Sequence, residues 1–132
     1  MSGAIDSRDL ARVHSPQPDP RLLERNLAAF GTGYPQFAAE VRAATDVDLE
    51  LSNAADGELT GTWMGRRLAS RHRPGEEVDR LLADVDLRDN ATIAVLGFGL
   101  GLHVERLARR MKRTGIVLVF EPDTALLKAV FS

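Results

Sequence analysis

The last third of the chain contains two short apolar runs separated by a stretch with helical periodicity. Residues 92–96 and 116–120 are rich in β-branched and aliphatic side chains and have the length of buried strands. Between them, apolar residues recur at helical spacing, at Val104, Leu107, Ala108 and Met111. This order predicts a βαβ unit, the opening of a Rossmann-like α/β domain.

Two short amphipathic helices are predicted near the start of the chain. One covers residues 21–30, and the second begins at Pro35, a residue favoured at the first helical position, and ends near Ala44. Residues 1–19 are expected to form a flexible tail, because residues 15–20 alternate proline with polar residues and should stay extended. The expected core positions are Leu23, Leu27 and Phe30 in the first helix, and Tyr34, Phe37, Ala38 and Val41 in the second.

A β-hairpin and a third helix are predicted next. Val47, Leu49 and Leu51 alternate with polar residues, which indicates a half-buried strand. Residues 53–57 favour a turn, residues 58–64 the returning strand, and residues 65–70 a further short strand. A helix then opens at Pro74, and its expected core stripe is Val78, Leu81, Leu82 and Val85.

The length of 132 residues suits one domain, or one small domain and part of another. A boundary is predicted near residues 88–91. It separates an α+β N-terminal segment of two helices and a β-hairpin (20–90) from the start of a truncated Rossmann-like domain (91–132). A last helix is expected from about Thr124. Its nearly terminal Phe131 is expected to need a partner from outside the chain.

The glycines after the first strand of the βαβ unit are the main candidate for a binding site. Gly97 permits a tight turn with positive φ, Gly99 allows a ligand to approach the backbone, and Gly101 allows the helix to pack close to the strand. The first amides of the helix form a cradle for an anion or polar ligand. Glu121, 20 residues after Gly101, is placed to accept hydrogen bonds from ribose hydroxyls.

Several interpretations of this loop stay open. The spacing is GxGxG, not the dinucleotide fingerprint GxGxxG, and it is closer to the first motifs of S-adenosylmethionine-dependent methyltransferases. Glycines are also required for packing a strand against a helix when nothing binds. His103 lies in the first helical turn, where it faces either a ligand or solvent.

Composition excludes several classes of protein. The net charge of −2 gives no overall case for binding nucleic acid or an anionic membrane. The absence of cysteine excludes disulfides and cysteine-based zinc sites, and the three histidines lack metal-ligand spacing. No secretory signal or 18-residue apolar run occurs in the sequence, so a cytoplasmic location is expected.

Arginines gather just before the third helix, with Arg66, Arg67, Arg71, His72 and Arg73 within eight residues. Guanidinium groups match phosphate and carboxylate oxygens, so an oxyanion site is one hypothesis. The favoured hypothesis is a solvated loop, or pairing with the acids at positions 76, 77 and 79. The neighbouring Trp63 is interpreted as a core anchor more readily than as a binding platform.

Three segments together resemble the motility-associated factor (Maf) family. Residues 68–77 resemble its "lhSrydP-x-x-Ea" segment, although this chain has His72 where the family commonly has Tyr. Residues 95–103 resemble "vlGfGlGyH", and residues 121–123 resemble "vEPd". The resemblance covers roughly residues 22–132 and keeps the order and gaps of the three segments.

Members of that family are glycosyltransferases that attach nonulosonic, sialic-acid-like sugars to flagellin. The resemblance implies a bacterial protein of several hundred residues, whose transferase centre lies in a later domain. The present residues would then be a non-catalytic N-terminal part, inactive alone, with no catalytic residue and no metal. The partners would be flagellin, the C-terminal transferase domain or a second copy of the chain. A nucleotide or nucleotide-sugar is the candidate ligand of Gly97, Gly99, Gly101, His103 and Glu121. The alternatives are a truncated methyltransferase-like domain that binds S-adenosylmethionine and a self-associating interaction module.

Overall fold

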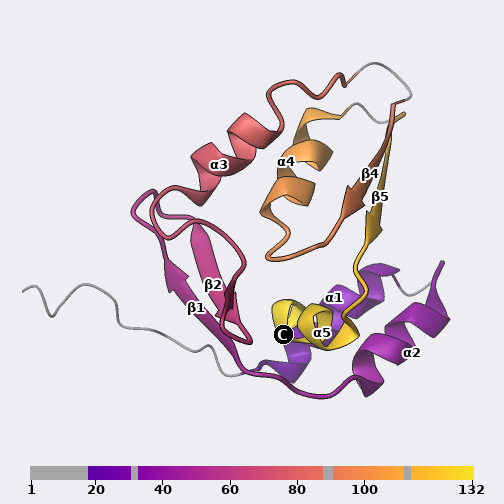
Figure 1. Ribbon diagram of the computed structural model, residues 1–132. Helices are drawn as coiled ribbons and strands as arrows, with labels where there is room; N and C mark the ends of the chain where they lie inside the picture. Colours follow the sequence, from indigo (N-terminus) through magenta and orange to yellow (C-terminus); the bar gives the residue numbers. More distant parts are fainter. Residues whose placement is uncertain (1–17, 31–32, 88–90, 112–113) are drawn as a thin grey trace, which may run out of the picture.

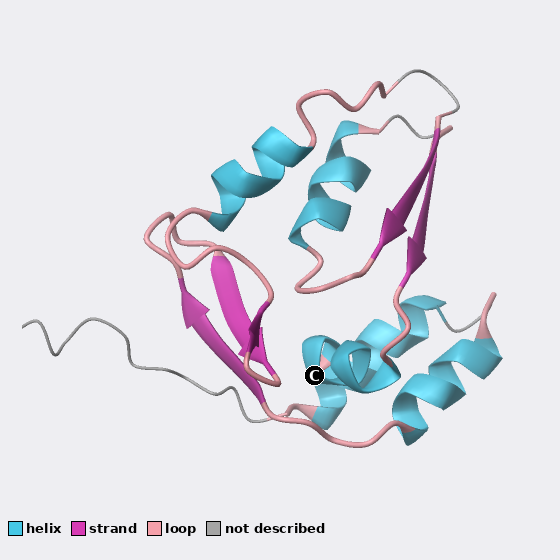
Figure 2. Cartoon of the chain, in the orientation of Figure 1, coloured by secondary structure: helices cyan, strands magenta, loops and turns pink. Residues whose placement is uncertain are grey.

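The computed structural model describes residues 18–30, 33–87, 91–111 and 114–132. Within these ranges the elements, in chain order, are α1 (Pro20–Phe30), α2 (Pro35–Ala43), β1 (Leu49–Asn53), β2 (Leu59–Trp63), β3 (Arg66–Arg67), α3 (Pro74–Leu81), β4 (Thr92–Leu96), α4 (Leu102–Arg110), β5 (Ile116–Phe120) and α5 (Thr124–Phe131) (Figure 1). The strands form two sheets, so the fold is mixed α/β as the sequence predicts (Figure 2). Residues 1–17 of the predicted tail and residues 88–90 of the boundary predicted near 88–91 lie outside the described residues.

The first sheet is the predicted hairpin with one added strand. β1 and β2 pair antiparallel, with Leu49 opposite Trp63 and Asn53 opposite Leu59. β3 continues the sheet from β2 with only two residues, within the predicted range 65–70. The hairpin is therefore confirmed.

The second sheet is a parallel pair that α4 connects. β4 and β5 are in register from Thr92 opposite Ile116 to Leu96 opposite Phe120. α4 lies between α3 and this sheet (Figure 1). Side chains from one face of the sheet join α3 and α4 in an apolar cluster built around Val78, Leu82 and Leu107, with Val85, Leu87, Ile93, Val95, Leu102 and Val117 packed against it.

Two predicted core positions of these helices are wrong. Leu81 is 66% exposed and Ala108 is exposed, although both belong to the apolar stripes read from the sequence. α3 buries the side that carries Val78 and Leu82 against α4, and Leu81 lies outside that contact. A stripe on a helix becomes core only as far as a neighbouring element covers it.

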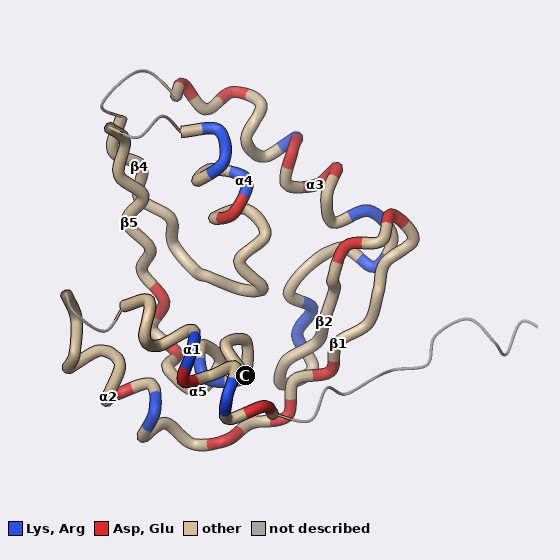
Figure 3. Tube along the Cα trace, turned by 180° about the vertical axis from the view of Figure 1, so that it is seen from behind, with Lys and Arg blue, Asp and Glu red and all other residues tan. Residues whose placement is uncertain are grey.

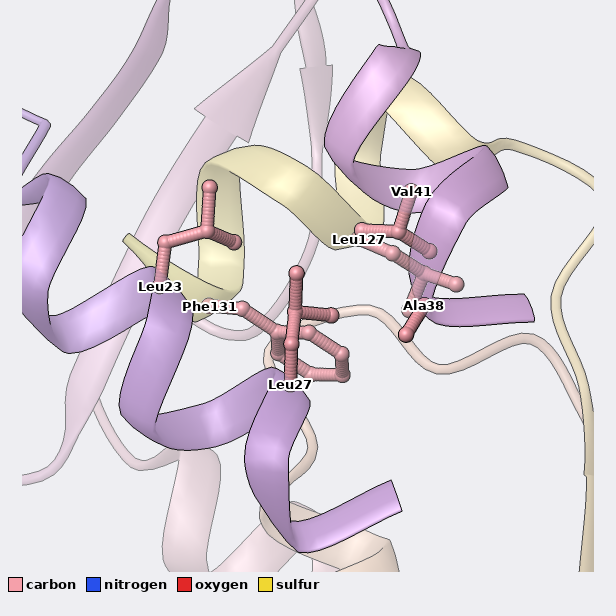
Figure 4. Close-up of a cluster of buried hydrophobic side chains, with 6 residues drawn as sticks. All are labelled: Leu23, Leu27, Ala38, Val41, Leu127 and Phe131. Carbon is pink, nitrogen blue, oxygen red and sulfur yellow. The ribbon is translucent and has the colours of Figure 1, made fainter. Parts of the chain in front are cut away.

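The second apolar cluster joins the two ends of the described chain. It contains residues of α1, α2 and α5, namely Leu23, Leu27, Ala38, Val41, Leu127 and Phe131 (Figure 4). Phe131 is only 8% exposed, and its ring lies 5.7 Å from that of Phe30 and 5.6 Å from that of Phe98. The expectation that Phe131 needs a partner from outside the chain is therefore wrong, because α5 packs against α1 and α2.

α5 is held in this position by polar contacts as well. The side-chain amide of Asn26 donates to the Phe131 carbonyl at 2.7 Å. The Lys128 ammonium donates to the Ala44 carbonyl at 2.8 Å and pairs with Asp46 at 2.7 Å. Elements from both sides of the predicted boundary thus share one core cluster.

α1 and α2 are also joined at the surface. The Arg42 guanidinium donates to both carboxylate oxygens of Glu24, at 2.8 and 2.9 Å. These hydrogen bonds lower the pKa of the Glu24 carboxyl below its ordinary value and raise that of Arg42. Both groups are exposed, so the pair orients the helices more than it stabilises them.

One face of the β4–β5 sheet has no described element against it (Figures 1 and 3). The side chains that alternate away from α4 are all uncharged. Leu96 is 85% exposed and Phe120 57%, and Ile116 and Leu118 are also exposed. We call this surface, made of Thr92, Ala94, Leu96, Ile116, Leu118 and Phe120, the bare face.

Candidate ligand-binding site

The glycine loop between β4 and α4 has the backbone conformation that its sequence predicts. Gly97 has φ +89°, so the positive φ expected there is confirmed. Gly99 and Gly101 also have positive φ, at +54° and +78°. A side chain at any of these positions would be strained, which explains the three glycines without reference to a ligand.

Gly101 has a packing role that differs from the expected one. A Cβ atom built at Gly101 would lie 2.6 Å from the Phe98 ring, which leaves no room for a side chain. The close neighbour is thus a ring of the same loop, not the strand. Because that ring also contacts Phe131, the loop is packed against the helical cluster.

Glu121 directly follows β5, at the strand end that the sequence predicts, and its carboxylate accepts hydrogen bonds from main-chain amides. Oε2 accepts a hydrogen bond from Phe98 N at 2.8 Å, and Oε1 accepts one from Asp123 N at 2.9 Å. Asp123 in turn accepts from Leu126 N at 3.0 Å and caps α5. In this arrangement Glu121 ties the glycine loop to the start of α5.

His103 makes a further hydrogen bond to the glycine loop. Its Nε2 lies 3.0 Å from the Gly97 carbonyl oxygen. A carbonyl can only accept, so Nε2 carries the proton and donates. His103 is half-buried and also lines a hollow beside α4. Its ring therefore supports the loop on one side and faces a cavity on the other.

This hollow has a volume of about 610 Å³. It lies between the segment that joins β3 to α3, α3 itself, and the start of α4. Of the predicted ligand-binding residues, Gly99 and His103 line it, whereas Gly97, Gly101 and Glu121 do not. A Cβ at Gly99 would have only the Leu68 carbonyl oxygen nearby, at 3.9 Å. The remaining lining residues are Leu68, Ala69, Glu77, Val78, Arg80, Leu81, Leu100 and Leu102.

A second hollow of about 420 Å³ adjoins the first and contains much of the arginine cluster. Its lining residues are Arg67, Leu68, Ala69, Ser70, Arg71, His72 and Glu77. Three of these, Leu68, Ala69 and Glu77, line both hollows. Sequence reasoning singled out the arginines, but it named Leu68 and Ala69 only as part of the family-like segment 68–77 and not as site residues, because the tertiary fold brings them beside the cavity.

Of the two favoured arrangements for the arginine cluster, a solvated loop or pairing with the nearby acids, the structure shows mainly the first. Arg73 binds Glu76 at 2.8 Å. Glu77 instead accepts a hydrogen bond from Ser70 N at 2.9 Å, and Asp79 pairs with arginines of α4. Arg66, Arg67 and Arg71 are exposed and form no ion pair with another described residue, which agrees with the solvated loop, and the expected pairing is found only for Arg73.

Trp63 lies at the end of β2 and is half-buried. Its indole Nε1 is buried without a hydrogen-bond partner among the described residues. Trp63 lines none of the hollows described above.

The described residues contain no group of three or more His, Asp or Glu side chains that could hold a metal ion. Among the same residues, no helix is long and apolar enough to cross a lipid bilayer.

A comparison with known proteins finds similarity to a bacterial protein. It is a protein of Treponema pallidum (strain Nichols) described as "Uncharacterized protein", 30% identical over 115 residues. The matched region is 80% of this chain and 39% of the relative, so the chain spans about two fifths of the relative's length. No protein-family model matches the chain. No solved structure matches it either.

Proposed function

We propose that this chain is the N-terminal, non-catalytic part of a larger Maf-like glycosyltransferase, which attaches nonulosonic sugars to flagellin. In this proposal β4, α4 and β5 open a Rossmann-like sheet, and the transferase centre lies in further polypeptide. The main support for the proposal is the exposed apolar bare face of the β4–β5 sheet. Parallel sheets are normally covered on both faces, so this face is expected to be covered by further polypeptide. The order of the three family-like segments supports the same proposal.

The rest of the same polypeptide is the occupant that suits the bare face best. Two five-residue strands present a surface of roughly 17 by 10 Å, given the usual spacings in a sheet. A stable interface between separate proteins buries about 800 Å² on each partner, several times more than this. Elements of the same chain need no such area, because they are already tethered. The similar Treponema protein is more than twice as long as its matched region, which is compatible with such elements.

A supporting role also agrees with the chemistry of the glycine loop. The carboxylate of Glu121 and the Nε2 of His103 already have partners within the chain. These polar groups hold the loop in shape. The chain would therefore position the transferase domain, or present flagellin to it, and would show no turnover alone.

A methyltransferase-like function is the second candidate, because GxGxG is followed by an acidic residue at the end of β5. The proposal predicts that S-adenosylmethionine and S-adenosylhomocysteine leave the thermal midpoint of this chain unchanged, because Glu121 already binds two amides. A ligand at 100 times its dissociation constant would add about 2.7 kcal/mol to stability, which thermal-shift measurements detect readily.

The matched control for this measurement is the Glu121→Gln variant, in which one carboxylate oxygen becomes an amide. A rise in the midpoint with the S-adenosyl compounds that is smaller in Glu121→Gln would overturn the glycosyltransferase proposal. It would show that Glu121 holds a ribose and that the chain is methyltransferase-like.

A further inference from the structure

We propose that the two adjoining hollows form one binding site for a small amphipathic organic anion, with an aliphatic body and a phosphate or carboxylate head. The proposal does not depend on the glycosyltransferase function and concerns a different part of the chain from the bare face. It rests on the contrast between the two hollows and on the wall that they share.

The larger hollow would take the aliphatic body. Its volume of about 610 Å³ is in the range of small-molecule sites. Six of its lining residues are aliphatic and come from three separate segments, namely Leu68, Ala69, Val78, Leu81, Leu100 and Leu102. Among the described residues, His103 supplies the only aromatic ring in the lining of this hollow, so a nucleobase would have little to stack against. Leu81 is 66% exposed, so a ligand that covers its side chain would bury apolar surface and gain binding free energy.

The smaller hollow would take the anionic head. Arg67, Arg71 and His72 line it, and neither arginine has an ion-pair partner among the described residues. Arginine forks bind phosphate and carboxylate oxygens through paired hydrogen bonds. The acid in the lining, Glu77, accepts a hydrogen bond from Ser70 N. Glu50 lines a small neighbouring hollow with both arginines but forms no ion pair with them.

The wall between the hollows is fixed before any ligand arrives. Leu68 N donates to the Gly61 carbonyl at 2.9 Å, and the Thr60 hydroxyl donates to the Ala69 carbonyl at 2.9 Å. Thr60 is itself buried. Because Leu68 and Ala69 line both hollows, one molecule can place its head in one and its body in the other. A preformed site lowers the free-energy cost of ordering protein side chains and loops when a ligand binds.

The test is isothermal titration calorimetry of the whole 132-residue chain with octyl phosphate, octanoate and uncharged octyl glucoside. We expect at least one of the two anions to bind at submillimolar concentration, and octyl glucoside to bind at least tenfold more weakly. Arg71→Gln should weaken binding of the anion about tenfold. Arg71 is exposed and forms no ion pair with the residues that the structure describes, so the variant should fold normally. The matched control is Arg25→Gln on α1, also exposed, which should change the affinity less than twofold.

A further variant separates this site from the bare face, which could also adsorb an alkyl chain. Leu118→Glu places a charge on the bare face and should leave binding of the anion unchanged. The proposal is overturned if neither anion binds, if octyl glucoside binds as tightly, or if Arg71→Gln behaves as Arg25→Gln. It is equally overturned if Leu118→Glu, and not Arg71→Gln, removes the binding.

Discussion

Replacing Leu27 by Ala is expected to lower the free energy of unfolding by about 3 kcal/mol. The Leu27 side chain is 1% exposed and lies between α1, α2 and α5, so its removal leaves a cavity that three helices must close together. Leucine-to-alanine changes at such sites cost about 2–5 kcal/mol. A domain of this size has only about 5–15 kcal/mol of stability in total, so the variant should be visibly destabilised.

The measurement is urea denaturation followed by circular dichroism, with Leu107→Ala and Leu59→Ala beside it. Leu107, also 1% exposed, lies at the centre of the other cluster. Leu107→Ala should lower the free energy of unfolding by a similar amount. Leu59 is 52% exposed, so Leu59→Ala should lower the free energy of unfolding by less than about 0.5 kcal/mol, as surface substitutions usually do. Equal losses for Leu27→Ala and Leu59→Ala would contradict the packing of α5 against α1 and α2.

Replacing Glu121 by Ala is expected to destabilise the chain by about 2–4 kcal/mol, although Glu121 is a charged residue at the end of a strand. Its carboxylate accepts hydrogen bonds from two part-buried amides, those of Phe98 and Asp123. Each buried amide left without an acceptor costs about 1–3 kcal/mol. The change also frees the glycine loop from α5, so the contact between Phe98 and Phe131 should weaken.

Hydrogen exchange of the amides of Phe98 and Asp123 measures this effect directly. Both should exchange much faster in Glu121→Ala than in the unaltered chain, alongside the fall in global stability. Glu50→Ala is the control, because Glu50 is exposed on β1 and forms no ion pair with the described residues. If the two variants lose the same stability, Glu121 does not tie the loop and is available to a ligand.

Local patterns predict much of this fold. Alternation at Leu49 and Leu51 marks the first strand, and helical spacing at Leu23 and Leu27 marks the first helix. The order of strand, glycines, helix and strand predicts the parallel pair β4–β5. These features depend on residues close together in sequence, where side-chain periodicity and turn chemistry decide the outcome.

The errors concern contacts between distant segments. The apolar side of α5 is evident in the sequence, but the pattern does not say that α1 and α2 cover it, so Phe131 was predicted to lack a partner. Likewise, the acids after Arg73 are near the arginines in sequence, yet Asp79 pairs with Arg110 on α4. In the candidate site, Gly99 and His103 were predicted, whereas Leu68 and Ala69 reach the hollow only through the fold.

We propose that the bare face is covered by further polypeptide in a flagellin glycosyltransferase. The most direct measurement is transfer of a nonulosonic sugar to flagellin by the whole polypeptide that contains this chain, compared between Leu118→Glu and Leu59→Glu. Both leucines are exposed here, but only Leu118 lies on the bare face. We predict that Leu118→Glu lowers transfer at least tenfold and that Leu59→Glu leaves it unchanged. Transfer at the same rate by both variants, or no transfer by the unaltered polypeptide, would contradict the account.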